Sequence, residues 1–234
     1  MMFCTVNAKV KAKRAKLLTA EDYGAMISSG QIFDGAALEH DAARLMHYIN
    51  ERPAKKFIKS MAAGLANGKT DIDYYLSLWR SLDALDKVSQ HAMKRVIGVE
   101  IDLRNILWMY RLKRHYNIVG GATYGHLIPL GNKTDMTTRM AECKNVAGLL
   151  AEISHSLYSG VFGDFSHGEQ RLVDAVKKQY RKQSRQYPNS IVVVCGYLYE
   201  KYVETRNITA IIEGVRQNVG VKEIVRQLVF DFTI

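Results

Sequence analysis

Several residue groups in this chain are of types that can do chemistry, but their spacing does not assemble an active site. Residues 131–135 contain the N-K-x-D pattern that contacts guanine in GTPases, yet no G-x-x-x-x-G-K-[ST] phosphate loop precedes it. His155 lies beside Ser156 without the G-x-S-x-G turn that exposes a nucleophile. Glu100 and Asp102 are two residues apart, which places them on different faces of a helix. The sequence therefore predicts no catalytic residue.

The possible metal ligands are equally scattered. The seven histidines form no H-E-x-x-H motif, and the three cysteines form no CxxC pair. We therefore expect no metal, no cofactor and no disulfide framework, which is typical of a cytosolic protein. The N-terminal residues lack the pattern of a secretory signal, so we expect a mature cytoplasmic protein.

Composition excludes other classes. With 47% hydrophobic and 24% charged residues, the 234-residue chain resembles a folded globular protein and not a disordered one. Charges interrupt every apolar run, so no segment reaches the roughly 18–20 apolar residues of a membrane helix. The formal net charge of +10 calls for an anionic partner: nucleic acid, a lipid surface or an acidic protein.

Any functional residues of this chain are expected to be held in place by helices. Only three prolines occur, and apolar residues recur at helical spacing in most of the chain, which predicts an all-α fold. The run of residues 191–194 is β-branched and suits a strand, but its continuation into helical spacing favours a helix. The expected helices cover residues 6–17, a segment from about 21, then 36–50, a segment from about 71, and 86–116, 136–158, 169–187, 191–216 and 221–230.

An internal repeat is the most specific pattern in the chain. Residues 102–106 and 204–208 both read acid-x-Arg-Asn-Ile, 102 positions apart. The acid and the asparagine are three residues apart and share a helix face, so we expect them to fix a neighbouring helix through buried hydrogen bonds. The carboxylate can also pair with an arginine. The predicted structural clusters are Asp102, Arg104, Asn105, Glu204, Arg206 and Asn207.

A glycine-rich loop separates the two copies of the repeat. Gly120, Gly121 and Gly125 interrupt the helical pattern and form the clearest loop in the chain. We therefore predict two helical units, residues 1–118 and 119–234, related by duplication.

Four stretches in the same order resemble one family. Residues 6–12, 98–114, 126–129 and 188–223 resemble the C-type subunits of the prokaryotic V-type (A/V-type) ATPases, a family that includes the eukaryotic d-type subunits. The resemblance implies a funnel-like, all-α fold of repeated helical units and no active site. It implies a central-stalk (rotor) subunit that couples the shaft of the soluble head to the membrane rotor ring during proton or sodium transport. It also implies a peripheral location on the cytoplasmic face of the membrane. Family members commonly carry three units, and only two signatures are found here.

The net positive charge fits a location beside an anionic membrane surface, because each lysine or arginine near such a surface contributes about 1 kcal/mol of binding free energy. The expected contact residues lie on two helices, and the strongest candidates are Lys9, Lys13, Lys16, Lys178, Arg181 and Lys182, with Lys11, Arg14, Lys177 and Arg185 as neighbours. The alternative is a basic all-α protein that binds nucleic acid or acts as a scaffold, with Trp79, Trp108 and the 13 tyrosines available for stacking.

Overall fold

The computed structural model describes residues 3–29, 38–69, 71–163 and 165–229, and within these ranges it contains helices and no strand. The prediction of an all-α fold is confirmed. The α-helices are α1 (Cys4–Arg14), α2 (Ala20–Ser29), α3 (Leu38–Met46), α4 (Arg52–Ala66), α5 (Ile72–Ser81), α6 (Lys87–His115), α7 (Thr134–Glu142), α8 (Val146–Ser154), α9 (Gly168–Gln186), α10 (Val192–Arg216) and α11 (Val221–Gln227). Short 3₁₀ helices, η1 (Leu82–Ala84) and η2 (Gly120–His126), precede and follow α6.

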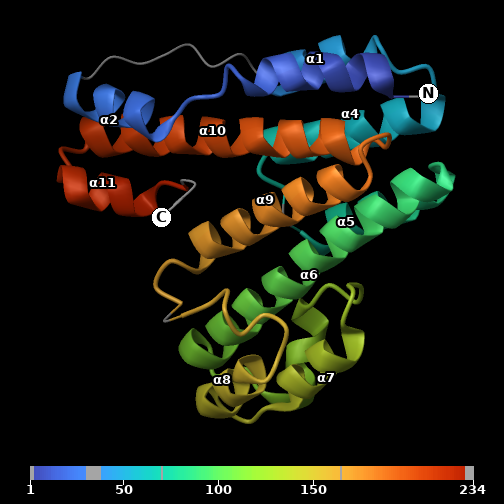
Figure 1. Ribbon diagram of the computed structural model, residues 1–234. Coiled ribbons are helices and arrows are strands. Elements are labelled where there is room, and N and C mark those ends of the chain that lie inside the picture. Colours follow the sequence, from blue (N-terminus) through green and yellow to red (C-terminus); the bar gives the residue numbers. More distant parts are fainter. Residues whose placement is uncertain (1–2, 30–37, 70, 164, 230–234) are drawn as a thin grey trace.

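Two long helices, α6 and α10, organise the molecule (Figure 1). Helix α9 lies between them and packs against both. The molecule is wider at the end where α10 lies, at the top of Figure 1, than at the opposite end. At this wide end, α1, α3 and α4 pack along α10, and α2 and α11 cover its C-terminal half. At the narrow end, α7 and α8 pack on the C-terminal half of α6. The residues of the two repeat signatures therefore lie on the two long helices, one on α6 and one on α10.

The β-branched run at the start of α10 is helical, as its context predicted. Ile191, Val192 and Val194 are all fully buried, so this turn is surrounded by other helices on every side. A helix that is apolar all round is stable when it is buried, and tertiary packing then outweighs the strand propensity of valine.

Two expectations about helices were wrong. Residues 136–158 do not form one helix: α7 ends at Glu142, and α8 begins at Val146 after the cap residue Asn145, whose side chain accepts a 2.8 Å hydrogen bond from Gly148 N–H. Helix α4 was not among the predicted segments, although Pro53 in its first turn is a recognised start signal. The predicted helices over residues 36–50 and 221–230 are shorter, and residues 36, 37 and 230 lie outside the described residues.

The hydrophobic core runs through both predicted units. One cluster contains buried residues from α1, α4, α6, α9 and α10, such as Val10, Ile101 and Val192. A second, smaller cluster joins α2, α10 and α11 through Met26, Ile211 and their neighbours. The predicted boundary between the two units, after residue 118, does not separate two cores, and it stays a prediction about internal repetition. In the part of the chain that the structure describes, no helix is both long enough and apolar enough to cross a membrane.

Candidate functional site

Asn105 ties a distant segment of backbone onto α6. Its side-chain amide donates to Ile128 C=O and its side-chain oxygen accepts from Ile128 N–H, both at 2.9 Å. Asn105 is fully buried and Ile128 is almost so, which means that water cannot replace either bond. The side-chain amide of Asn105 therefore pairs with the backbone after η2 through one donor and one acceptor, as a backbone amide of a neighbouring β-strand would.

Asn207 makes the same paired contact on α10. Its side chain bonds to both Val229 C=O and Val229 N–H at 2.9 Å, again to a residue about two dozen positions further along the chain. The two asparagines of the repeat are thus structurally equivalent. The expectation that they fix a neighbouring helix was wrong in one respect, because each partner is irregular backbone that follows a short helix, η2 in one case and α11 in the other.

Asp102 holds the loop that leads into α7. Its carboxylate accepts a 2.7 Å hydrogen bond from the Tyr158 hydroxyl and a 3.4 Å bond from Lys133 N–H. Gly131 allows this approach: its φ is +138°, and a Cβ there would lie 2.1 Å from Asp102 Oδ1. Burial raises the pKa of Asp102 to about 6, although the Tyr158 hydroxyl and backbone N–H groups favour the charged form.

The same loop contains the guanine-like N-K-x-D pattern, and its residues have structural partners. Asn132 donates to Arg95 C=O on α6 at 3.0 Å, and its side chain lies against Gly98. Together with the Lys133 contact to Asp102, this docks the loop on α6.

Glu204 is the counterpart of Asp102 on α10, and it also holds backbone that leads into a helix. It accepts a 2.9 Å hydrogen bond from Leu18 N–H, just before α2 begins, and it pairs with Lys201 one turn earlier on α10. Since Leu18 lies 186 positions away in sequence, this contact ties the N-terminal segment to the C-terminal helix. The start of α2 is itself capped, because Thr19 and Asp22 bond to each other through side chains and backbone N–H groups.

The two arginines of the repeat are not equivalent, and neither forms an ion pair with the acid of its own signature within the described residues. Arg104 is buried and donates to the Tyr75 hydroxyl at 2.9 Å, and that hydroxyl donates to Glu100 at 2.8 Å. The guanidinium of Arg206 instead lies 5.9 Å from the Tyr202 ring. The Tyr75–Glu100–Arg104 network was missed, although Glu100 and Arg104 stand at the i,i+4 spacing of a helix ion pair.

The lysines predicted as contact residues on the first helix differ in their surroundings. Lys13 forms an ion pair with the buried Asp41 and lies over the Tyr197 ring, and Lys9 lies over the Tyr48 ring. Lys16 follows the end of α1 and is exposed. Lys9 and Lys13 are therefore engaged on the α3 side of α1.

The basic residues predicted on α9 lie together. Lys178, Arg181 and Lys182 line a shallow surface with Arg185, and Lys178 also pairs with Asp174. Arg181 reaches across to α10, where it bonds to Glu200 at 3.1 Å. From the other side, Arg14 on α1 bonds to the same carboxylate at 2.7 Å. Glu200 thus bridges two helices.

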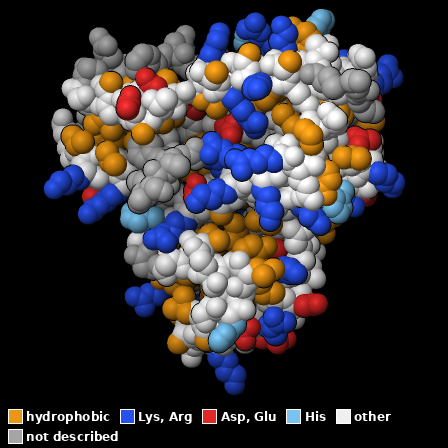
Figure 2. Space-filling view, in the orientation of Figure 1, with side chains coloured by type: hydrophobic (Ala, Val, Ile, Leu, Met, Phe, Trp, Pro, Cys, Tyr) orange, Lys and Arg blue, Asp and Glu red, His pale blue; other side chains and the backbone are white. Residues whose placement is uncertain are grey.

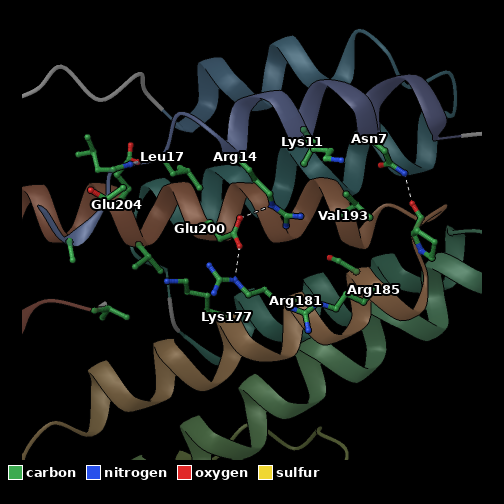
Figure 3. A pocket seen from close by; sticks show the side chains of 18 of the residues that line it. Asn7, Lys11, Arg14, Leu17, Lys177, Arg181, Arg185, Val193, Glu200 and Glu204 are labelled. Atoms are coloured by element: carbon green, nitrogen blue, oxygen red, sulfur yellow. Dashed lines mark hydrogen bonds and ion pairs between the residues drawn. The ribbon is translucent and has the colours of Figure 1, made fainter. Parts of the chain in front are cut away.

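A groove of about 910 Å³ opens along this bridge, between α1 and α9, with α10 as its floor (Figure 3). Of the basic residues named from the sequence, five line it: Lys11, Arg14, Lys177, Arg181 and Arg185. Figure 2 shows lysine and arginine side chains gathered in the middle of this face. Tertiary structure has therefore joined basic residues about 170 positions apart in sequence into one surface.

No group of three or more histidine, cysteine, aspartate or glutamate side chains suited to a metal ion occurs in the described ranges. The geometry described above is that of an all-α protein in which several buried polar side chains, such as Asn105 and Asn207, join segments that are distant in sequence. The chain matches the ATP synthase (C/AC39) subunit family over residues 33–227. It belongs to this family of V/A-type ATPase subunits. A comparison with curated proteins gives no match.

Proposed function

We propose that this chain is a non-catalytic central-stalk subunit of a V/A-type rotary ATPase. In this role it couples the shaft of the soluble head to the membrane rotor ring while protons or sodium ions are transported. The observation that carries the proposal is the family match over residues 33–227. The same match does not favour the alternative of a nucleic-acid-binding or scaffold protein.

The internal bonding supports a mechanical role. A coupling subunit must transmit torque without yielding, so its segments must be fixed to one another. Asn105 and Asn207 each fix a distant segment through two buried hydrogen bonds, and Glu204 fixes the N-terminal segment to α10. Buried polar networks that are fully bonded make a fold rigid. In this proposal the protein lies at the cytoplasmic face of the membrane and contacts it through the ring.

The proposal is tested in membranes of the native host from which the gene has been deleted. We expect ATP hydrolysis by the soluble head to persist while ATP-driven ion uptake into vesicles is lost, and we expect the purified protein to restore uptake. A tagged copy should also recover shaft and ring subunits from gently solubilised membranes. Normal uptake in the deletion strain, or recovery of nucleic acid in place of these subunits, would overturn the proposal.

A further inference from the structure

The groove between α1 and α9 carries an excess of positive charge. Its lining contains five cationic side chains and two carboxylates, Glu200 and Glu204. Both carboxylates are already engaged, Glu200 by two arginines and Glu204 by Lys201. Of the five cations, Lys11 on α1 and Arg185 on α9 are the two that are exposed, and neither forms an ion pair among the described residues.

The groove is elongated and partly apolar. From Lys177 to Arg185 it follows α9 for about 12 Å, since an α-helix rises about 1.5 Å per residue. Its opposite wall is α1, from Asn7 to Arg14, followed by the partly buried Leu17 and Leu18. Figure 3 shows Lys11 and Arg14 on one wall, and Arg181 and Arg185 on the other. Apolar surface thus lies beside two rows of positive charge.

We propose that this groove binds an acidic amphipathic helix of a partner polypeptide. The apolar face of such a helix would cover Leu17 and Leu18, and carboxylates on its two flanks would meet Lys11 and Arg185. A planar membrane surface cannot fill a concave groove between two helices, and a small phosphate compound would leave the apolar part uncovered. The inference goes beyond the proposed function, because coupling does not require this groove to be occupied.

The test uses a synthetic helical peptide and the full-length protein. The probe is a peptide of about 14 residues, about 21 Å long as a helix, with leucine every third or fourth position and glutamate on both flanks. Its control replaces every glutamate with glutamine. Binding is measured by fluorescence anisotropy at low salt and again at about 0.5 M salt, where the Debye length falls below about 5 Å.

Two matched variants locate the binding surface. Lys11→Glu/Arg185→Glu reverses one exposed charge on each wall, and Lys56→Glu/Lys59→Glu makes the same change in net charge on α4, away from the groove. All four positions are exposed, so both variants should keep the fold, which circular dichroism checks. We expect the groove variant to weaken binding of the acidic peptide by at least about tenfold, because like charges now face each other. The α4 variant should bind with nearly the wild-type affinity.

The expected result also includes loss of binding at high salt and weak binding of the glutamine peptide. Absence of binding, or equal weakening by the two variants, would overturn the proposal. Anionic phospholipid vesicles are tested in parallel. If the vesicles bind in a way that depends on Lys11 and Arg185 while the peptide does not, the groove recognises lipid headgroups and the assignment to a polypeptide is wrong. None of these results depends on ion transport, so the groove and the proposed function can fail separately.

Discussion

Replacing Asn105 with leucine tests whether the repeat signature holds the fold together. The substitution removes two 2.9 Å hydrogen bonds and leaves the N–H and C=O of Ile128 without partners in a buried place. Each unpaired backbone group costs about 1–3 kcal/mol. Burial of the leucine side chain returns about 1–2 kcal/mol, because leucine is close to asparagine in size and more apolar. We therefore expect the free energy of unfolding to fall by about 2–4 kcal/mol.

The assay is thermal and urea unfolding followed by circular dichroism. For a chain of this length each kcal/mol shifts Tm by about 2–4 °C, so Asn105→Leu should lower Tm by about 5–15 °C. Asn207→Leu should give a loss of similar size, since its two bonds to Val229 have the same lengths. The control is Asn50→Leu at an exposed asparagine.

A second variant separates bonding from side-chain shape. Asn105→Asp keeps the size but replaces the donor to Ile128 C=O with an oxygen, so it should also destabilise the protein. Amide exchange at Ile128 should become faster in Asn105→Leu, which removes the acceptor of Ile128 N–H, and less so in Asn105→Asp, which keeps an oxygen there. If Asn105→Leu and Asn105→Asp both unfold within about 0.5 kcal/mol of the wild type, the range of ordinary surface substitutions, the reasoning is refuted.

Three further predictions concern the loop before α7 and the bridge between α1 and α9. The pKa of Asp102 is raised to about 6 from an ordinary 3.8, so the native state binds the proton more tightly than the unfolded chain does. The protonated Asp102 therefore adds up to about 3 kcal/mol to the free energy of unfolding. This contribution is complete below about pH 4 and is lost as the pH rises through 6. Asp102→Asn should remove this dependence, so the difference in Tm between variant and wild type should change between about pH 5 and about pH 8, and a constant difference would contradict it. Gly131→Ala should cost about 2–4 kcal/mol by urea unfolding, because the new Cβ meets Asp102 and the backbone is strained, whereas Gly121→Ala, with open space around it, should be nearly neutral. Glu200→Gln should lower stability by about 1–3 kcal/mol at low salt and less at high salt, because the two arginines that it bridges then repel each other; a loss that is independent of salt would argue against this cause.

Much of the helical framework could be predicted from sequence, because helical spacing of apolar residues is a local property. The long helices over residues 86–116 and 191–216 were predicted close to their observed bounds. The break between α7 and α8 was missed because apolar spacing continues across it, and only the cap residue Asn145 indicates the new start.

The repeat signature identified the residues that make structural contacts, but it did not identify all of their partners. Helix geometry alone placed the acid and the asparagine on one face. That the arginine turns to Tyr75 in one copy and lies near Tyr202 in the other depends on neighbours outside the signature. The same limit applied to the basic residues, whose helical spacing did not tell which lysines would meet Asp41 or face the groove.

The sequence by itself determined the helical class of this protein, its two equivalent asparagines and its family resemblance, because these follow from residue types at short spacing. Tertiary structure alone decided that Glu204 holds Leu18, that Glu200 bridges α1 and α9, and that a basic groove forms beside them. The physical reason is distance along the chain. Contacts between residues some 20 to 190 positions apart depend on how whole helices pack, and the packing reflects the sum of many weak apolar contacts that no short pattern contains.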